Sequence, residues 1–187
     1  LASAAPGPQS DEVLLHDRYL LATSWVSKTL NGTPSHASRP AISANGRYVV
    51  FESPFGLLVP GPDTNVTDVY WRDTVTQTTE RIDVSTAGVQ ANNECFQPQV
   101  SADGRYVAYE SYANNLVPGD LTCCSDTDVF LRDRQAGTTI RVNERPDATP
   151  PLGAGSPSLS ADGAFVAFVS GDPLLVPGDT NATADIF

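Results

Sequence analysis

Short apolar segments, most of them alternating with polar residues and separated by turn residues, run along the whole chain. Residues 105–111 are rich in Tyr and Val, and they follow Asp103-Gly104. An Asp-Gly dipeptide suits a tight hairpin because both residues tolerate positive φ. No stretch of helix length shows the 3.6-residue apolar period of an amphipathic helix. The pattern therefore predicts an all-β protein.

The same pattern occurs three times. The run SADGRYVAYES at 101–111 is matched by SANGRYVVFES at 43–53 and by SADGAFVAFVS at 160–170. The glycines at 46, 104 and 163 are 58 and then 59 residues apart. A repeat of this length, built from short β-type segments, predicts a toroid or an array of small sheets.

Each repeat contains four strand signals. In the middle copy they are Gln97–Ser101, Arg105–Ser111, Asp128–Asp133 and Thr138–Asn143. In the preceding copy, Asp68–Asp73 matches the third signal and Thr78–Val84 the fourth. Consecutive strands joined by short turns predict a four-stranded meander as the building unit.

The chain starts and stops in the middle of a unit. Glu12–Arg18 matches a third strand and Ala22–Ser27 a fourth, whereas Pro157–Ser160 and Phe165–Ser170 match a first and a second strand, and Asp185–Phe187 begins a third. We therefore predict a flexible or processed N-terminus over 1–10, a half-unit over 11–37, complete units over 38–93 and 94–148, and a half-unit over 154–187. The two half-units are complementary.

Three runs of the middle copy carry a resemblance to a known family. They are SADGRYVA at 101–108, LVPGD at 116–120 and DVFLRDR at 128–134. Together they resemble the TolB-type, WD-repeat-like β-propeller repeats of many exported bacterial proteins, and the match covers nearly the whole chain after about residue 11. The resemblance implies four-stranded blades, about three per chain, with half-blades at both ends. Because such propellers serve as binding scaffolds, structural units and accessory domains of hydrolases, it implies fold rather than function.

Three blades are fewer than the roughly four to eight with which known propellers close. Three arrangements follow: completion of the half-blades by another copy, giving a ring or a head-to-tail filament; further blades in a longer chain; or a closed three-bladed monomer with crowded inner strands. We favour completion by another copy, since an unfinished blade leaves two bare sheet edges and proteins seldom leave long edges unpaired.

Composition narrows the choice of partners. The chain has 22 acidic and 11 basic residues and a net charge of -11, which argues against nucleic acid or an anionic membrane surface. No window approaches the roughly 18 consecutive apolar residues of a spanning helix, so we expect no membrane insertion. Residues 1–5 resemble the small-residue end of a secretory signal, and Asn31, Asn65 and Asn181 begin glycosylation sequons. We therefore expect a secreted or cell-surface protein.

Acidic loops recur between the second and third strands, and they are candidate calcium sites. Carboxylate and amide oxygens at short spacing supply the ligands that Ca²⁺ requires. Asp and Asn also form Asx-turns, which is the alternative explanation of the same loops. The candidate ligands are Asp63, Asn65, Asp68, Asp120, Asp126, Asp128, Asp179, Asn181 and Asp185.

The three cysteines are an odd number for a disulfide framework. Cys123 and Cys124 are adjacent and cannot readily bridge to each other. In a four-stranded meander, the loop before the first strand and the loop joining the second and third strands emerge on the same face. We therefore predict a disulfide between Cys95 and Cys124, or Cys123, outside the cell, and free thiols inside it.

Catalytic signals are weak. The chain has only His16 and His36 and lacks nucleophile-elbow, zincin and phosphate-loop motifs, so we expect no enzyme. Five aromatic residues fall inside strand patterns and are expected in the core rather than on a sugar-stacking surface: Tyr70, Trp71, Phe130, Trp25 and Tyr106.

The expected function is that of an extracellular structural or binding scaffold. It would self-associate with copies of the same chain by completing a shared blade, with calcium as the candidate cofactor. The alternatives are an accessory propeller domain of a larger exported hydrolase and a carbohydrate-binding module.

Overall fold

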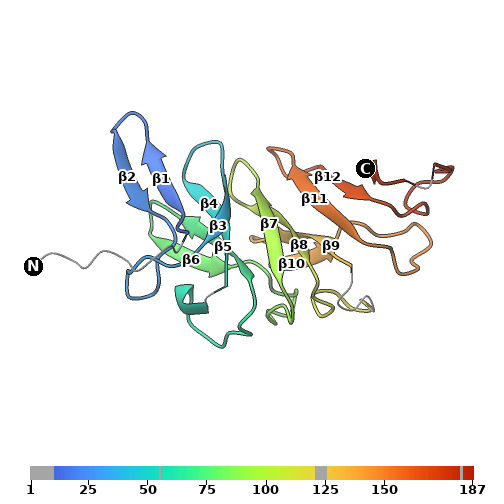
Figure 1. The fold of residues 1–187 in the computed structure, drawn as a ribbon, viewed down its shortest axis with the longest axis horizontal. Coiled ribbons are helices and arrows are strands. Elements are labelled where there is room, and N and C mark those ends of the chain that lie inside the picture. Colours follow the sequence, from blue (N-terminus) through green and yellow to red (C-terminus); the bar gives the residue numbers. More distant parts are fainter. Residues whose placement is uncertain (1–10, 55, 121–125, 182) are drawn as a thin grey trace, which may run out of the picture.

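The computed structural model describes residues 11–54, 56–120, 126–181 and 183–187. Within these residues, nearly all regular structure is strand (Figure 1). The strands are β1 Leu14–Asp17, β2 Ala22–Trp25, β3 Ser38–Ile42, β4 Tyr48–Ser53, β5 Asp68–Asp73, β6 Thr78–Arg81, β7 Cys95–Val100, β8 Tyr106–Ser111, β9 Asp128–Asp133, β10 Thr138–Arg141, β11 Ala154–Leu159, β12 Val166–Ser170 and β13 Asp185–Ile186, and a 3-10 turn spans Gly56–Leu58. The predicted all-β class is confirmed.

The strands form four antiparallel sheets that follow one another along the chain. Two sheets are complete meanders, β3-β4-β5-β6 and β7-β8-β9-β10, and we call them blades 1 and 2. The hairpin β1-β2 precedes them and the sheet β11-β12-β13 follows them. Figure 1 shows the hairpin at one end of the row and β11-β12 at the other, with blades 1 and 2 between them.

The two blades share one register. Tyr48 pairs with Asp73 and Ser53 with Asp68 across β4 and β5. Tyr106 pairs with Asp133 and Ser111 with Asp128 at the equivalent positions of β8 and β9. The first strands β3, β7 and β11 each carry a register shift and one residue of positive φ: Arg39, Gln97 or Ser156. Such shifts are β-bulges, which bend the strand.

Both faces of a blade are buried, so the apolar core lies between the sheets. The side chains of successive strand residues point to opposite faces. On one face of blade 1, Phe51 and Tyr70 pack with Val13 and Val26 of the hairpin segment. On the other face, Val50, Val69, Trp71 and Ile82 pack with Val107, Tyr109 and Phe130 of blade 2. A third cluster joins Val129 of blade 2 to Ala154 and Phe168 of the last sheet.

One contact recurs at both blade junctions. A Cβ atom added to Gly104 would lie 2.2 Å from the ring of Tyr48, and a Cβ atom added to Gly163 would lie 2.2 Å from the ring of Tyr106. Both glycines have positive φ. The second strand of each blade thus lays a tyrosine ring on the hairpin glycine of the next sheet, and only glycine leaves room for it.

A buried glutamate accompanies the tyrosine at each junction. Glu52 accepts a hydrogen bond from the backbone N–H of Gln97 at 3.3 Å, and Glu110 accepts one from the N–H of Ser156. The donors are the positive-φ residues of the next sheet's bulge. The tyrosine and the glutamate therefore define a repeated junction between neighbouring sheets.

The two half-blades do not complete each other within one chain. They lie at opposite ends of the row (Figure 1), so the structure does not have the closed three-bladed arrangement. Among the described residues, no helix is long and apolar enough to cross a membrane.

Candidate functional site

In the hairpin and in both blades, a carboxylate at or just before the start of the third strand meets a donor on the fourth strand. Glu12 accepts a hydrogen bond from Trp25 Nε1 at 2.8 Å. Asp68 pairs with Arg81 at 3.1 Å, and Asp128 pairs with Arg141 at 3.4 Å. Trp25, Arg81 and Arg141 occupy equivalent register positions on their strands. These carboxylates thus hold the third strand to the fourth.

The loop of blade 1 brings two of its three predicted ligands to the same arginine. Arg81 Nη2 lies 3.5 Å from Asp63 Oδ1 as well as 3.1 Å from Asp68 Oδ2. Gln90 Nε2 donates to both oxygens of Asp68. Asn65 has a positive φ of 58°, a backbone conformation that asparagine tolerates in turns.

The loop of blade 2 repeats this arrangement. Arg141 Nη1 lies 3.2 Å from Asp120 Oδ1 and 3.4 Å from Asp128 Oδ2. Asp126 lies apart from them, on the wall of an open groove. Residues 121–125 between them are outside the described part of the chain.

Among the described residues, no arginine pairs with the predicted ligands of the last loop, whereas Asp172 at the start of that loop pairs with Arg145 Nε at 2.8 Å. Asn181 Nδ2 donates to both carboxylate oxygens of Asp185 at 3.1 and 2.9 Å, and Asn181 N–H donates to Asp179 Oδ1 at 3.2 Å. Among the described residues, no group of three or more His, Cys, Asp and Glu side chains is arranged to hold a metal ion. The contacts in all three loops are those of turns and ion pairs, and calcium binding stays a prediction.

A buried acid pair distinguishes blade 1 from blade 2. Asp83 Oδ1 accepts from the N–H of Val69 at 3.1 Å, and Asn143 Oδ1 accepts from the N–H of Val129 at the same distance. Asn143 Nδ2 then donates to Asp128 Oδ1 at 2.6 Å. In blade 1, the position of Asn143 is held by Asp83, which faces the Asp68 carboxylate. Burial, together with the charge of Asp68, raises the pKa of Asp83 well above its usual range.

The predicted disulfide is not present in the described part of the structure. Cys95 is a free thiol that is fully buried in the core between blades 1 and 2. Its Sγ atom lies 3.1 Å from Ser111 Oγ. The side chain therefore faces the core and not the loop side, and both predicted partners, Cys123 and Cys124, lie outside the described residues.

The aromatic residues divide into two groups. Tyr70, Trp71 and Phe130 are buried in the clusters between sheets, as predicted. Trp25 is 49% exposed, so its predicted core position is wrong. It lies on β2, and within the described part of the chain no further sheet covers the outer side of the hairpin (Figure 1).

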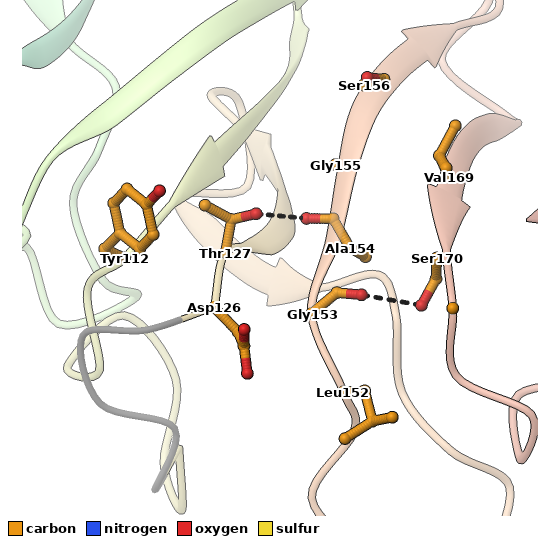
Figure 2. Close-up of a pocket in the computed structure, with 11 residues that line it drawn as sticks. Tyr112, Asp126, Thr127, Leu152, Gly153, Ala154, Gly155, Ser156, Val169 and Ser170 are labelled. Atoms are coloured by element: carbon orange, nitrogen blue, oxygen red, sulfur yellow. Dashed lines mark hydrogen bonds between the residues drawn. The ribbon is translucent and has the colours of Figure 1, made fainter. Parts of the chain in front are cut away.

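A groove of about 510 Å³ separates blade 2 from the last sheet. Figure 2 shows Tyr112 and Asp126 on one side of it and the backbone of residues 152–156 on the other. Thr127 Oγ1 donates to Ala154 O at 2.9 Å, and Ser170 Oγ donates to Gly153 O at 2.8 Å (Figure 2). A Cβ atom added to Gly153 would lie 2.9 Å from Asp126 Cβ. The groove walls are therefore held together by junction contacts, and Asp126 is the predicted ligand that lines it.

The hairpin end of the row presents an unpaired strand edge. β1 pairs with β2 and with no other described strand. Asp17 accepts from the N–H groups of Tyr19 and Leu20, as Asp73 and Asp133 do in their own turns. Asp73 and Asp133 additionally receive a bidentate arginine from the second strand, Arg47 or Arg105, whereas no second strand pairs with this hairpin among the described residues. The hairpin glycine of blade 1, Gly46, has open space where Gly104 meets Tyr48.

The other end presents the complementary elements. Phe165 stands at the position of Tyr48 and Tyr106, and it is 75% exposed. Val169 replaces the junction glutamate, and Ala164 replaces the arginine that pairs with the third-strand aspartate. The described part of this sheet has a first and a second strand and a short third strand.

The prediction from sequence missed the junction residues. The glutamates at 52 and 110 and the tyrosines at 48 and 106 recur in the repeat alignment. Their departure from the pattern in the third copy, as Val169 and Phe165, was a readable signal that this face meets something different.

Comparisons with known proteins were made by sequence and by structure. No family model and no curated protein matches the sequence. TolB from Acinetobacter baumannii superposes with a TM-score of 0.53 at 16% identity, covering 94% of this chain and 34% of TolB. The β-propeller domain of the Trilobed protease from Pyrococcus furiosus, which has an open velcro topology, gives a TM-score of 0.52 at 12% identity, covering 85% of this chain and 40% of that chain.

The tricorn protease gives a TM-score of 0.52 at 14% identity over 92% of this chain and 14% of the protease. The chain spans less than half the length of each of these three proteins. At such identities a likeness shows the fold and not the activity. Four-stranded meanders stacked face to face, together with these matches, identify the chain as a protein of the TolB-like β-propeller fold.

Proposed function

We propose that the chain is an extracellular structural or binding scaffold that associates with copies of itself by completing a shared blade. The observation that carries the proposal is the strand order of the two end sheets. The hairpin β1-β2 supplies a third and a fourth strand, and β11-β12 supplies a first and a second. Joined edge to edge, they give the order β11-β12-β1-β2, which repeats that of blades 1 and 2.

The open edge of β1 presents the backbone N–H and C=O groups that this pairing needs. The N–H of Val26 donates to Val13 O, so the backbone of Val13 faces β2. Because the backbone groups of an antiparallel strand alternate in direction, those of Leu14 and His16 face the open edge. In the register of blades 1 and 2, Asp17 then lies opposite Phe165 and His16 opposite Val166.

One segment competes for the same edge. Ile186 and Asp185 of β13 pair with Val169 and Ser170, the places that Val13 and Glu12 would take. β1 must therefore displace β13 when a blade is completed. The exchange favours β1, because β1 brings its own fourth strand, β2.

The test removes one backbone N–H group, that of His16, which faces the open edge of β1. His16→Pro removes the N–H that would bond to β12, and proline is tolerated on edge strands. His16→Ala is the matched control, because it also removes the imidazole but keeps the N–H. The chain of residues 1–187 is expected to form particles larger than 19.8 kDa in light scattering, and His16→Pro is expected to abolish them while His16→Ala keeps them. Equal particle size for both variants contradicts the proposal.

Calcium would add rigidity to the acidic loops in this proposal. The net charge of -11 supports cation binding in general, whereas Arg81 and Arg141 already neutralise part of the charge in two of the loops. Calcium is thus an accessory to the scaffold rather than a condition of its assembly.

A second candidate function is that of an accessory propeller in a larger exported hydrolase. The observation that favours it is the likeness to the β-propeller domain of the Trilobed protease. In that case the partner strands of β1 come from the same, longer polypeptide. A native chain heavier than 19.8 kDa under denaturing conditions supports this candidate over self-association.

A further inference from the structure

The two junction glutamates hold equivalent positions, but they have different neighbours. Glu52 Oε1 accepts a hydrogen bond from Ser38 Oγ at 2.9 Å and lies 3.6 Å from Arg39 Nε. Glu52 Oε2 accepts a further hydrogen bond from the N–H of Gln97. A hydroxyl, a guanidinium and a backbone amide thus share this carboxylate, and together they offset the cost of burying its charge.

Glu110 lacks the first two of these partners. In the register of blade 2, Phe96 takes the place of the serine and Gln97 that of the arginine. Among the described residues, the N–H of Ser156 is the one group that donates a hydrogen bond to Glu110. Glu110 is nevertheless only 4% exposed. Its carboxylate is therefore buried with less compensation than that of Glu52.

The electrostatics of Glu110 agree with this difference. Burial raises the pKa of Glu110, whereas the Ser156 amide and the charge of Arg39 act in the opposite direction. Arg39 lies beside Glu52, whose own charge raises the pKa of Glu110 further. A second positive group close to Glu110 would supply what its own blade does not.

Two glycines place this carboxylate next to the groove between blade 2 and the last sheet. A Cβ atom added to Gly155 would lie 3.1 Å from the carboxyl carbon of Glu110, and one added to Gly153 would lie 2.9 Å from Asp126 Cβ. Both glycines line the groove (Figure 2). Alternate residues of an extended segment point to the same side, roughly 6.6 Å apart. Two carboxylates therefore approach one side of this segment.

Tyr112 adds an aromatic wall to the groove. Figure 2 shows it across the groove from Gly155, and its ring lies 5.5 Å from that of Phe96. A guanidinium group is planar, binds carboxylates through two parallel N–H groups and stacks on aromatic faces. Ca²⁺ instead requires roughly six to eight oxygen ligands, and the described residues contain no group of three acidic side chains arranged to hold a metal ion. The chemistry of the groove favours the guanidinium.

We propose that the groove between blade 2 and the last sheet binds a guanidinium group, which lies beside Glu110 as Arg39 lies beside Glu52. Asp126 supplies the second carboxylate, and Tyr112 supplies the stacking surface. The net charge of -11 favours the approach of such a cation. A free guanidinium compound and an arginine side chain of a partner protein present the same chemistry. The inference concerns a ligand, and it does not require self-association.

The first experiment compares two ligands of the same shape and different charge. Isothermal titration calorimetry measures the binding of N-acetylarginine amide and of N-acetylcitrulline amide, in which a neutral urea group replaces the guanidinium. Saturable binding of the arginine compound, at least about tenfold tighter than that of the citrulline compound, supports the proposal. Equal affinities, or no binding of either compound, overturn it.

Two further arms identify the source of the guanidinium and test the metal. Tighter binding of acetyl-glycyl-arginyl-glycine amide than of agmatine supports an arginine side chain of a partner, and the reverse order supports a free guanidinium compound. CaCl₂ is titrated separately. Calcium binding that is lost in Glu110→Gln, without any binding of the arginine compound, assigns the groove to a metal and overturns the proposal.

A charge-neutral substitution tests the central carboxylate. Glu110→Gln keeps an oxygen that can accept from the N–H of Ser156 but removes the charge, and it is expected to weaken binding of the arginine compound at least about tenfold. Asp11→Asn is the matched control. It also removes one negative charge, but Asp11 is exposed and precedes the hairpin at the other end of the row (Figure 1). Equal affinities of the two variants overturn the assignment.

A second substitution supplies the missing guanidinium from within the chain. Gln97→Arg recreates beside Glu110 the arrangement of Arg39 and Glu52, and Arg39 shows that an arginine adopts positive φ at this position of the first strand. The variant is expected to abolish binding of the arginine compound while unfolding in urea at the same or a higher midpoint. Gln97→Met, which is of similar length and uncharged, is expected to keep binding. Undiminished binding by Gln97→Arg overturns the proposal.

Discussion

At the scale of the residue, one position shows how the repeat was adapted to different local chemistry. Ser27, Asp83 and Asn143 each accept a hydrogen bond from the second residue of the neighbouring third-strand segment. Asn143 also donates to Asp128, which a carboxyl group at this place can do only when it carries a proton. Burial and the neighbouring Asp68 raise the pKa of Asp83, which favours the protonated carboxyl in a place where the ionised form is costly to bury.

This pair predicts opposite effects of two reciprocal substitutions. Because the pKa of Asp83 is raised in the folded state, its stabilising contribution is complete below the unfolded pKa of about 4 and is lost as pH rises through the folded value. Asp83→Asn should remove that loss and raise the free energy of unfolding by about 1 kcal/mol at alkaline pH. Asn143→Asp should introduce a similar loss in blade 2. Urea unfolding at pH 5 and pH 9 measures both, and identical pH slopes for wild type and Asp83→Asn contradict the assignment.

At the scale of the element, the third strands were the easiest to predict. The predicted ranges Asp68–Asp73 and Asp128–Asp133 are those of β5 and β9, because each begins and ends at an aspartate that is fixed by an arginine or a turn. The first strands begin earlier in the sequence than predicted. β7 begins at Cys95, where the prediction started at Gln97, and β11 begins at Ala154, where the prediction started at Pro157. Their bulge lets a residue of positive φ interrupt the alternation, and a two-residue period cannot represent that interruption.

The candidate site was harder to predict than the strands. Spacing placed carboxylates together in each loop, and the structure does bring Asp63 near Asp68 and Asp120 near Asp128. The arginines that join them come from the fourth strand, beyond the whole of the third strand and its turn. Only the hairpin register reveals that proximity, so sequence spacing led to calcium ligands or Asx-turns as the two explanations and missed the ion pairs.

The missing arginine of the third copy predicts a gain of association. In blades 1 and 2 the Arg47–Asp73 and Arg105–Asp133 pairs join the second and third strands, and Arg105 lowers the pKa of Asp133 to about 2. In a shared blade the equivalent positions are Ala164 of one copy and Asp17 of the other. Ala164→Arg should therefore tighten self-association by about fivefold per junction.

Adding Asp17→Asn should cancel that gain. The amide oxygen of asparagine keeps the acceptor for the turn N–H groups of Tyr19 and Leu20 but removes the charge that the introduced arginine needs. A double-mutant cycle followed by sedimentation equilibrium measures the coupling. A gain that persists in the double variant shows that the introduced guanidinium acts elsewhere.

At the scale of the whole molecule, the sequence predicted the sheets but not how far apart its ends lie. The phase of the repeats showed two complementary half-blades, and a closed monomer was consistent with that phase. The structure places the halves at opposite ends of the row (Figure 1). Each of the two repeated junctions has a fixed geometry, which is set by a tyrosine, a glycine and a buried glutamate. The row of sheets therefore does not turn far enough for its two end sheets to meet.

The charge of the whole chain predicts how salt affects assembly. Two copies of net charge -11 repel each other, and the second strand that would enter a shared blade carries Phe165 and Val169 where blades 1 and 2 carry a tyrosine and a glutamate. Added NaCl should therefore tighten association several-fold by screening, whereas an assembly held by surface ion pairs would loosen. CaCl₂ at the same ionic strength separates screening from calcium binding, because an effect beyond that of NaCl indicates a specific site.

The tyrosine-on-glycine junction also bears on how such a chain can lengthen during evolution. Blade 1, blade 2 and the last sheet each carry an aromatic residue, Tyr48, Tyr106 or Phe165, and a hairpin glycine of positive φ. Duplication of one 58-residue segment therefore inserts a blade that already fits both of its new neighbours. Gene length can grow or shrink in whole repeats without a single compensating substitution in the core, and the circumference of the final assembly changes with it.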